Sequence, residues 1–430
     1  ERPAEAADLL DAYAVHLLSA GRLGPLAAYL DALPAETLRT HPMLIFSLGD
    51  LARLHSRFEE ALGWYQQAET LWRERGMITE VGRALRGQAR VYLDTVNPSK
   101  AEELLQQALR LSDGTVDRES QARLYELLAE NRLNAGRVEE AERLRQKAEE
   151  LRSEGPTDEQ LLFRVLLRTG RINEARLALE KRAAAEQRIP VQTPRAHRET
   201  LLLLSLIYAF QGEGELAYQA ALEGTQRGEN LKSPFVTAVG HMRQGHALMA
   251  RSAFFAQRQT NYADARTQFE KCVHISRSLN VSRLLVEADW GLCRASGYMG
   301  DLPQAQQYAQ NAIEIAAQAG DEWIASLVRL ALGASLVLTG RYEAAESWLN
   351  RTVMGFRECS DVFGRCAARL WLCLSWQRQK LEQRLDAVLP DVLVVCHTQG
   401  YDYLWTRPSL LGAPDERIFV PLLALARQRN

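Results

Sequence analysis

The sequence predicts an all-α solenoid, a superhelix of about nine to ten stacked helix pairs with a repeat of roughly 40 residues. The first observation is a glycine that precedes an alanine by five residues. At five places this motif lies between two apolar-periodic segments: Gly136–Ala141, Gly170–Ala175, Gly212–Ala217, Gly300–Ala305 and Gly340–Ala345. Such a glycine can end one helix in a left-handed C-cap, so that the next helix starts at once as an antiparallel neighbour. The second observation is that no run of alternating β-branched residues marks a strand.

The alanines of this motif, with their variants, define the period of the repeat. They are Ala61, Ala101, Ala141, Ala175, Ala217, Ala265, Ala305 and Ala345, with spacings of 40, 40, 34, 42, 48, 40 and 40 residues. Another small residue stands twelve positions before most of them, for example Gly49, Ala89 and Ala129. Paired small residues allow two helices to pack closely, because larger side chains would hold the backbones apart. The 48-residue spacing before Ala265 indicates an insertion.

The elements follow in order from this period. An early pair is expected at 5–19 and 24–32. The first (A) helices of the later pairs are expected at 43–54, 79–94, 119–134, 159–169, 197–211, 235–256, 281–298, 321–338 and 361–378. The second (B) helices are expected at 58–75, 99–111, 138–151, 172–187, 214–228, 261–279, 302–318, 342–358 and 381–399.

Prolines support these boundaries, because a proline is tolerated in the first turn of a helix. Those at expected helix starts are Pro42, Pro98, Pro156, Pro234 and Pro303, and we expect no proline inside a helix. Residues 188–196 are the expected long loop. The repeat region spans 1–400, and 401–430 is expected to be a C-terminal cap or a linker toward a following domain.

Charge and composition exclude several classes of protein. The 430 residues include 52 Lys and Arg and 54 Asp and Glu, so the net charge is −2 and gives no general attraction for nucleic acid or an anionic membrane. The longest apolar stretch, 201–210, is about half of the roughly 20 residues that a membrane span needs. The six cysteines form no C-x-x-C pair, which predicts buried thiols in a cytoplasmic protein. The start at Glu-Arg-Pro rather than Met leads us to expect a piece of a longer chain.

No pattern of residues predicts catalysis or a cofactor. The closest histidines, His241 and His246, are five residues apart, whereas metal ligands on a helix prefer a spacing of three or four. No H-E-x-x-H or G-x-S-x-G motif occurs. Paired carboxylates such as Glu59 and Glu60 are more typical of solvated helix faces than of an acid–base pair. We therefore expect no enzyme activity, no metal and no cofactor in this chain.

The small-residue pairs and the glycine turns resemble tetratricopeptide repeats, stretched from 34 to roughly 40 residues. Stretched repeats of this kind are similar to the sensor region of MalT-like bacterial regulators, which are large signal-transducing (STAND) ATPases. The stretches Leu17-Leu-Ser-Ala-Gly-Arg-Leu, Leu30-Asp-Ala-Leu-Pro and His41-Pro-Met-Leu resemble the junction after the ATPase in these proteins. The stretch from Trp405 to Gly412 resembles the one that leads into a DNA-binding domain in some members.

This resemblance implies a sensing and self-associating arm of a transcriptional activator. ATPase and DNA-binding modules would lie elsewhere in the same chain, because no G-x-x-x-x-G-K-[ST] loop and no helix-turn-helix occur in this sequence. The expected partner is a small-molecule, peptide or protein effector, and neither a membrane nor direct contact with nucleic acid is expected.

The concave surface of such a superhelix, lined by the A helices, is the expected binding surface. Two sets of residues lie on it: Arg83, Arg86, Arg90, Arg123 and Glu126 on one side, and Glu287, Trp290 and Arg294 further along. Arginine forks suit carboxylate or phosphate, and an aromatic ring among charges suits a sugar, nucleoside or peptide. The alternatives are ion pairs between the arginines and Glu126 or Glu130, and a core position for Trp290.

Three aromatic residues, Tyr401, Tyr403 and Trp405, lie beyond the last predicted pair. They are expected to cover the apolar end face of the stack, or to contact a following domain or a second subunit.

The leading hypothesis is a non-catalytic domain that senses an effector on its concave surface for a bacterial transcriptional activator. The alternative is a constitutive protein–protein interaction scaffold without a small-molecule ligand.

Overall fold

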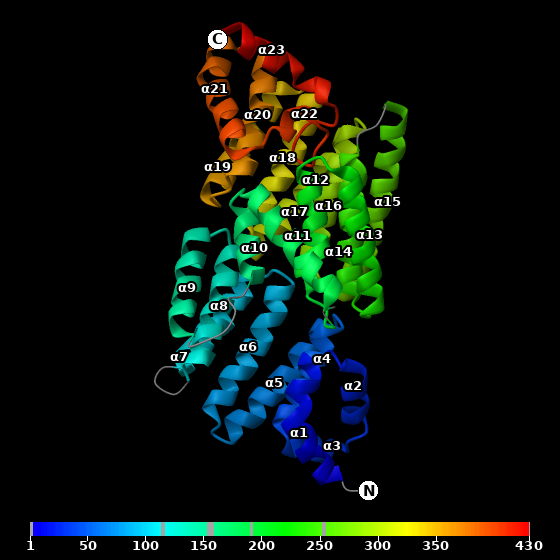
Figure 1. The fold of residues 1–430 in the computed structure, drawn as a ribbon, viewed down its shortest axis with the longest axis vertical. Helices are drawn as coiled ribbons and strands as arrows, with labels where there is room; N and C mark the ends of the chain where they lie inside the picture. Colours follow the sequence, from blue (N-terminus) through cyan, green and yellow to red (C-terminus); the bar gives the residue numbers. More distant parts are fainter. Residues whose placement is uncertain (1–2, 113–116, 153–158, 190–191, 252–254, 430) are drawn as a thin grey trace.

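The computed structural model describes residues 3–112, 117–152, 159–189, 192–251 and 255–429, and it is built from consecutive antiparallel helix pairs (Figure 1). The N-terminal helices are α1 Pro3–Ser19, α2 Leu23–Asp31, α3 Ala35–Thr40, α4 Pro42–Leu54, α5 Phe58–Glu74, α6 Ile78–Asp94, α7 Pro98–Ser112, α8 Arg118–Asn134, α9 Val138–Leu151, α10 Glu159–Arg168 and α11 Ile172–Arg188. After the 3-10 turn η1 Ala196–Arg198 follow α12 Thr200–Phe210, α13 Gly214–Asn230, α14 Pro234–Ala250, α15 Phe255–Leu279, α16 Ser282–Tyr298, α17 Leu302–Ala319, α18 Glu322–Leu338, α19 Tyr342–Glu358, α20 Val362–Arg378 and α21 Glu382–Gln399. The chain ends with α22 Tyr403–Thr406, η2 Glu416–Ile418 and α23 Val420–Arg429. The predicted all-α helix-pair solenoid is confirmed.

The two helices of a pair occupy different layers. In α18, 14 of 17 residues are buried, whereas in its partner α19 only 5 of 17 are. A helix that is apolar nearly all round is covered on both sides, and one with a single buried stripe faces solvent. The first helices of the pairs therefore form an inner layer and the second helices an outer one.

Small residues allow these layers to approach, as the sequence predicted. The ring of Tyr65 on α5 lies against Gly49 of α4 and Gly87 of α6, where an added Cβ would stand 2.6 and 2.8 Å from it. Phe269 on α15 lies in the same way against Gly245 and Gly291. Each glycine leaves space for an aromatic ring of the outer layer, which closes the groove between two inner helices.

Left-handed residues end the inner helices. Gly136, Gly170 and Gly340 have φ values of 76, 85 and 78°, and the N–H of Arg171, one residue after Gly170, donates to the carbonyl of Leu166 at 2.9 Å. This is the C-cap geometry predicted from the motif. Ser56, after the inner helix α4, and Ser360, after the outer helix α19, adopt the same conformation, with φ of 64 and 56°, although a side chain makes it less favourable.

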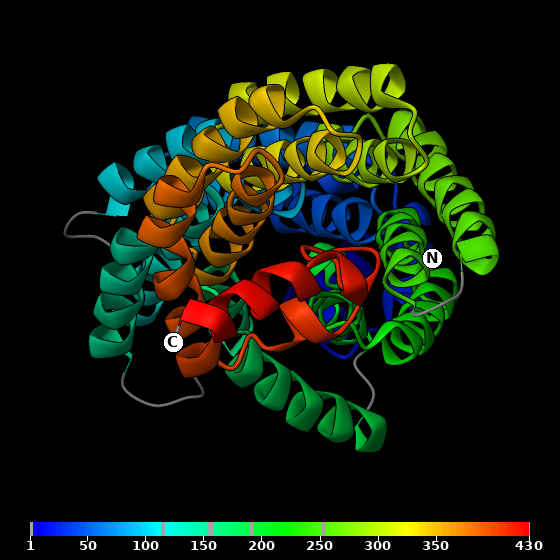
Figure 2. The same ribbon diagram turned by 90° about the horizontal axis from the view of Figure 1, so that it is seen from above.

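Successive turns of the superhelix contact each other. The Ser56 and Ser233 hydroxyls, 177 residues apart, are hydrogen-bonded at 3.1 Å, and the rings of Phe58 and Phe235 meet at 5.7 Å. Farther along, the amide of Val362 donates to the carbonyl of Thr169 at 3.3 Å. Seen from above in Figure 2, the pairs curve into a ring, and α22 and α23 (red) lie across its opening.

The structure corrects several predicted boundaries. The helix predicted at 235–256 ends at Ala250, and the insertion instead lengthens α15, whose Arg258 is held by an ion pair with Asp415 at 2.9 Å. A helix absent from the prediction, α3, precedes α4. Pro156, a predicted helix start, lies outside the described residues.

The expectation that no helix contains an interior proline is wrong, because Pro390 lies inside α21. Its side chain is exposed on the outer layer. Because this proline lies on the solvent side of the helix, the helix can accommodate it at lower cost than in a packed interior.

We predict that Gly170→Ala destabilises the protein much more than Gly340→Ala. Both changes place a side chain at positive φ, which costs about 1–2 kcal/mol. Only at Gly170 would the new Cβ also stand 2.5 Å from the backbone nitrogen of Phe363 in the next superhelical turn; at Gly340 nothing lies within 4 Å. Overpacking of this kind adds about 1–3 kcal/mol. Urea unfolding of the two variants measures the difference, and equal midpoints would contradict the contact between turns.

Candidate functional site

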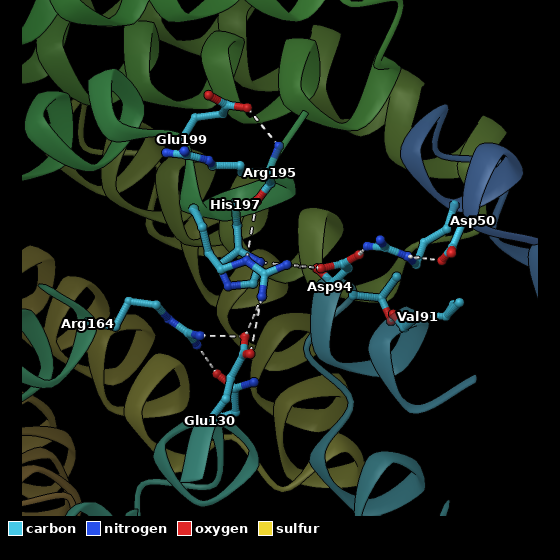
Figure 3. Close-up of polar contacts among 12 residues, drawn as sticks. Asp50, Val91, Asp94, Glu130, Arg164, Arg195, His197 and Glu199 are labelled. Atoms are coloured by element: carbon cyan, nitrogen blue, oxygen red, sulfur yellow. Dashed lines mark hydrogen bonds and ion pairs between the residues drawn. The ribbon is translucent and has the colours of Figure 1, made fainter. Parts of the chain in front are cut away.

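The inner layer carries a buried network of charges from four helices and one loop (Figure 3). Asp94, at the end of α6, accepts a hydrogen bond from Arg53 of α4 at 2.6 Å and another from Arg198 of η1. Arg198 also binds both carboxylate oxygens of Glu130 on α8, at 3.0 and 3.1 Å. Arg164 of α10 donates to Glu130 at 2.7 Å. This network ties the inner ends of consecutive repeats together and leaves both carboxylates 7% exposed or less.

A second network lies deeper, between α10, α14, α16 and α18. Glu287 accepts from Arg283 at 2.6 Å and from Arg243 at 3.3 Å, and Asp321 binds Arg283 and Arg168. Burial by itself would raise the pKa of the Glu287 carboxyl, but Arg283 and Arg243 outweigh burial and lower the pKa below its ordinary value. Glu287 is therefore ionised and held by two cations, a buried arrangement that is stable only while its partners remain.

His197 of η1 lies between these networks. Its Nδ1 lies 3.2 Å from the carbonyl of Asp94 and donates to it. Burial, and then the nearby charges of Arg164, Arg198 and Arg283, hold the pKa of His197 well below its ordinary value. The imidazole is therefore neutral inside the folded protein.

One group of charges on the inner layer is not paired in this way. Arg83, Arg86 and Arg90 of α6 are half-buried and lie beside the exposed Arg123 of α8; we call these four residues the arginine cluster. Within the described residues, no carboxylate is within 4 Å of Arg83, Arg86 or Arg90, and Arg123 pairs only with Glu119 at 3.2 Å. Burial first, and then Arg90, Arg83 and Arg123, lower the pKa of Arg86 to about 10.

The predicted ion pairs between these arginines and Glu126 or Glu130 do not form. Glu126 binds Arg152 at 2.7 Å, and Glu130 binds Arg164 and Arg198. Arg164 and Arg198 belong to later parts of the chain, and both bind Glu130. Glu130 is the carboxylate that the sequence pattern had placed opposite the arginines of α6.

The second predicted set is buried instead of open. Trp290 is 2% exposed and packs on His246, with ring centroids 4.4 Å apart. Arg294 is 1% exposed, and its Nη2 donates to the carbonyl of Ser409 at 2.7 Å. Within the described residues, no hydrogen bond or ion pair joins this set to the arginine cluster. A role for Glu287, Trp290 and Arg294 in ligand contact stays a prediction.

The three predicted C-terminal aromatics lie inside the fold. Tyr401 is 1% exposed, and its hydroxyl donates to the carbonyl of Gly170 at 2.7 Å. The rings of Tyr401 and Tyr403 both contact Phe363, at 5.0 and 5.8 Å, and Trp405 contacts Phe419 at 6.1 Å. They pack against apolar residues of this chain. That they cover the end face of the stack, or contact a following domain or a second subunit, stays a prediction.

Sequence reasoning missed most of the buried network, namely Asp94, Arg164, Arg198, Arg243, Arg283 and Asp321. The available signal was a charge within an otherwise apolar inner helix, as in Leu161-Leu-Phe-Arg164-Val-Leu-Leu-Arg168. Such charges are almost never buried without a partner. The pattern therefore predicts that a partner exists but does not identify it.

No metal centre or membrane span emerges from the described residues. None of their His, Cys, Asp and Glu side chains gather in groups of three or more that could hold a metal ion. All six cysteines are buried free thiols, as predicted. Among the helices that were described, none has the length and apolar character to cross a bilayer.

Comparison with known proteins identifies the fold. No family model matches the chain, and no curated protein matches it in sequence. A solved structure of a Rap protein complexed with competence and sporulation factor is similar, with a TM-score of 0.50, 12% identity, and coverage of 82% of this chain and 98% of that one. At this identity the similarity shows the tetratricopeptide-like fold alone.

Two further structures share less of the geometry. A STAND protein with a tetratricopeptide repeat sensor from Pyrococcus horikoshii has a TM-score of 0.36 and 13% identity, over 88% of this chain and 52% of that one. The Cut9–Hcn1 assembly of the APC/C has a TM-score of 0.38 and 11% identity, over 90% and 87%.

We predict that Glu130→Ala destabilises the protein by about 3–5 kcal/mol, because it leaves the buried Arg164 and the half-buried Arg198 without their shared carboxylate. Glu103→Ala, on the exposed face of α7, is the matched control and should change stability by less than about 0.5 kcal/mol. Urea unfolding followed by circular dichroism measures both. A Glu130→Ala midpoint equal to that of the control would contradict the network.

Stability should also fall as the pH drops below about 6.5, the pKa of a histidine in an unfolded chain. There the unfolded state binds a proton on His197 that the folded state excludes, so the free energy of unfolding decreases by up to about 1.4 kcal/mol per pH unit. His197→Asn should remove this contribution, whereas His16→Asn, at an exposed position of α1, should not. Urea unfolding from pH 5 to 8 measures the slope, and an unchanged slope in His197→Asn would be inconsistent with a neutral buried imidazole.

Proposed function

We propose that this chain is a non-catalytic sensor and protein-interaction domain that binds an anionic effector at the arginine cluster on its inner surface. The observation that carries the proposal is that Arg83, Arg86 and Arg90 are half-buried and mutually repulsive, with no carboxylate within 4 Å among the described residues. Elsewhere on the inner layer, the buried carboxylates of Asp94, Glu130 and Glu287 are each matched to arginines.

Holding several arginine side chains together in a partly buried site has a free-energy cost. Partly burying a cation is unfavourable unless an anion or a hydrogen-bond acceptor compensates it. An effector that brings a carboxylate or phosphate would gain bidentate contacts and relieve the repulsion at once. The chemistry therefore favours an anion: a phosphate group, or a carboxylate such as the C-terminus of a peptide.

We further propose that the domain serves a bacterial transcriptional activator, as the resemblance to MalT-like regulators implies. Nucleotide and DNA binding would then belong to flanking modules of the same chain, and the location would be cytoplasmic. The similar Rap structure is a complex with competence and sporulation factor. By analogy we propose ligand binding for this fold as well, although one fold supports many functions.

The alternative, a constitutive protein–protein scaffold, is favoured by one observation. The inner surface of the C-terminal half is filled by the chain's own side chains, including Trp290 and Arg294. Under this alternative, partners would bind elsewhere and no small anion would change stability. A binding experiment therefore separates the two functions.

We predict that Arg86→Gln stabilises the ligand-free protein by about 0.5–2 kcal/mol, because it removes the central charge of a repulsive cluster. The same variant should lose the stabilisation produced by an anion. Arg110→Gln, at an exposed position of α7, is the matched control and should behave as the unchanged protein.

The measurement is thermal unfolding at constant ionic strength with inorganic phosphate, a nucleoside monophosphate, or a short peptide with a free or an amidated C-terminus. A ligand at 100 times its dissociation constant stabilises by about 2.7 kcal/mol. A shift with one probe that disappears in Arg86→Gln but not in Arg110→Gln supports sensing. Absence of any shift, or a shift that Arg86→Gln retains, would reject the arginine cluster as the site.

A further inference from the structure

The C-terminal part of the chain passes through the inside of the superhelix. Helix α21 ends at Gly400, and after α22 residues 407–415 run without regular structure to η2; we call residues 407–415 the tail segment. Its ends are extended, with φ of −145° at both Arg407 and Asp415. Residues 408–413 are all buried, and Figure 2 shows this part of the chain (red) within the ring of helices.

Side chains of the helix pairs bind the main chain of this segment. Four of its carbonyls accept hydrogen bonds from four side chains: Ser409 from Arg294 at 2.7 Å, Leu411 from Trp371 at 2.9 Å, Gly412 from Tyr298 at 3.4 Å and Pro414 from Arg258 at 3.0 Å. In addition, the amide of Leu410 donates to the carbonyl of Ala209 at 2.9 Å. The donors come from α15, α16 and α20, and the acceptor carbonyl from α12.

Side-chain pockets and terminal ion pairs complete the site. Leu410 and Leu411 are 2% and 4% exposed within the main hydrophobic core. At one end Arg407 pairs with Glu213, and at the other Asp415 pairs with Arg258 at 2.9 Å. Gly212 allows the close approach, because an added Cβ would stand 2.7 Å from the carbonyl oxygen of Pro408.

This pattern is that of a bound peptide and differs from that of a helix pair. Helices of the solenoid satisfy their own backbone, and they contact one another through side chains. The tail segment instead has four of its carbonyls bound by side chains of the surrounding wall, while the adjacent side chains of Leu410 and Leu411 are buried in the core. Proteins recognise extended peptides in this way: hydrogen bonds to the main chain give affinity, and pockets for side chains give specificity.

We propose that the inner wall formed by α12, α15, α16 and α20 is a peptide-binding groove, and that the tail segment is its ligand in cis. A partner that fits it is an extended peptide with a basic residue and a proline before two leucines and an acidic residue after them. This groove shares no residue with the arginine cluster, so the inference does not depend on the proposed function.

The tether determines how such a partner competes. A segment joined to its own groove acts at an effective concentration of the order of millimolar, so a free peptide displaces it only when it binds more tightly or when the cis contact is weakened. Arg294 gives a reason for tighter binding: it is 1% exposed and its Nε and Nη1 have no hydrogen-bond partner among the described residues. A peptide that brings an additional acceptor to this guanidinium would make contacts that the tail segment does not.

The test uses the full chain and a fluorescent peptide of residues 406–415. Leu410→Asp combined with Leu411→Asp in the chain places charges in the apolar pockets, weakens the cis contact and leaves the groove intact. Anisotropy should then show the peptide binding this variant at least tenfold more tightly than the unchanged chain. Arg427→Ala, an exposed change on α23 beyond the segment, is the control and should bind the peptide as weakly as the unchanged chain. A peptide carrying the same two aspartates should not bind.

A folded double variant that fails to bind the peptide would overturn the proposal. A second measurement covers the case in which that variant does not fold. In hydrogen exchange of the unchanged chain, the amide of Leu410 should exchange through a local opening, faster than amides in the middle of α16 and α20. If the Leu410 amide exchanged only when α16 and α20 also exchange, in one global unfolding event, the tail segment could not be a releasable ligand.

Discussion

Contact between successive turns of the superhelix is the constraint on which the rest of this structure depends. The five pairs from α4–α5 to α12–α13 bring Ser233 back onto Ser56, and the later pairs continue to stack on the earlier ones. Because the inner helices are then covered on both sides, they bury almost their whole circumference, and any charge they carry must find a partner inside the protein. The turn glycines serve this constraint twice: Gly170 ends α10 at positive φ and also lets the backbone of Phe363 approach.

The electrostatics of the inner layer follow from that burial. Asp94, Glu130, Glu287 and Asp321 each have arginine partners, often from repeats far apart in sequence, so the networks also act as links between superhelical turns. The arginine cluster, along the middle of α6 and the facing part of α8, departs from this rule. The nearby carboxylates of Glu126 and Glu130 already bind other arginines. The surplus positive charge of the cluster therefore results from the packing of several helices and not from α6 alone. Arginines that are paired with buried carboxylates have a structural role, whereas the unpaired arginines of the cluster are candidates for binding.

In the C-terminal half, the tail segment rather than a network of charges fills the inside of the superhelix. There the inner layer is lined by large apolar side chains such as Trp371, and the tail segment fills the space that they enclose. The similarity to the Rap structure extends to the helix-pair architecture, whereas the tail segment and its donors are features of this chain's own contacts. The shared fold therefore does not identify the function, which has to be inferred from the site, as expected for an architecture that supports many functions.

The sequence by itself determined the fold class, the period of the repeat and most helix boundaries, because these depend on local causes: apolar periodicity, small residues where helices touch, and left-handed glycines at turns. It also singled out the arginines of α6. Only the tertiary structure decided that these arginines meet no carboxylate among the described residues, since Arg164 and Arg198, distant in sequence, bind Glu130 instead. It likewise decided that Arg294 faces Ser409 instead of solvent. Partners of buried charges are set by how the superhelix closes on itself, and no periodicity within one repeat encodes that closure.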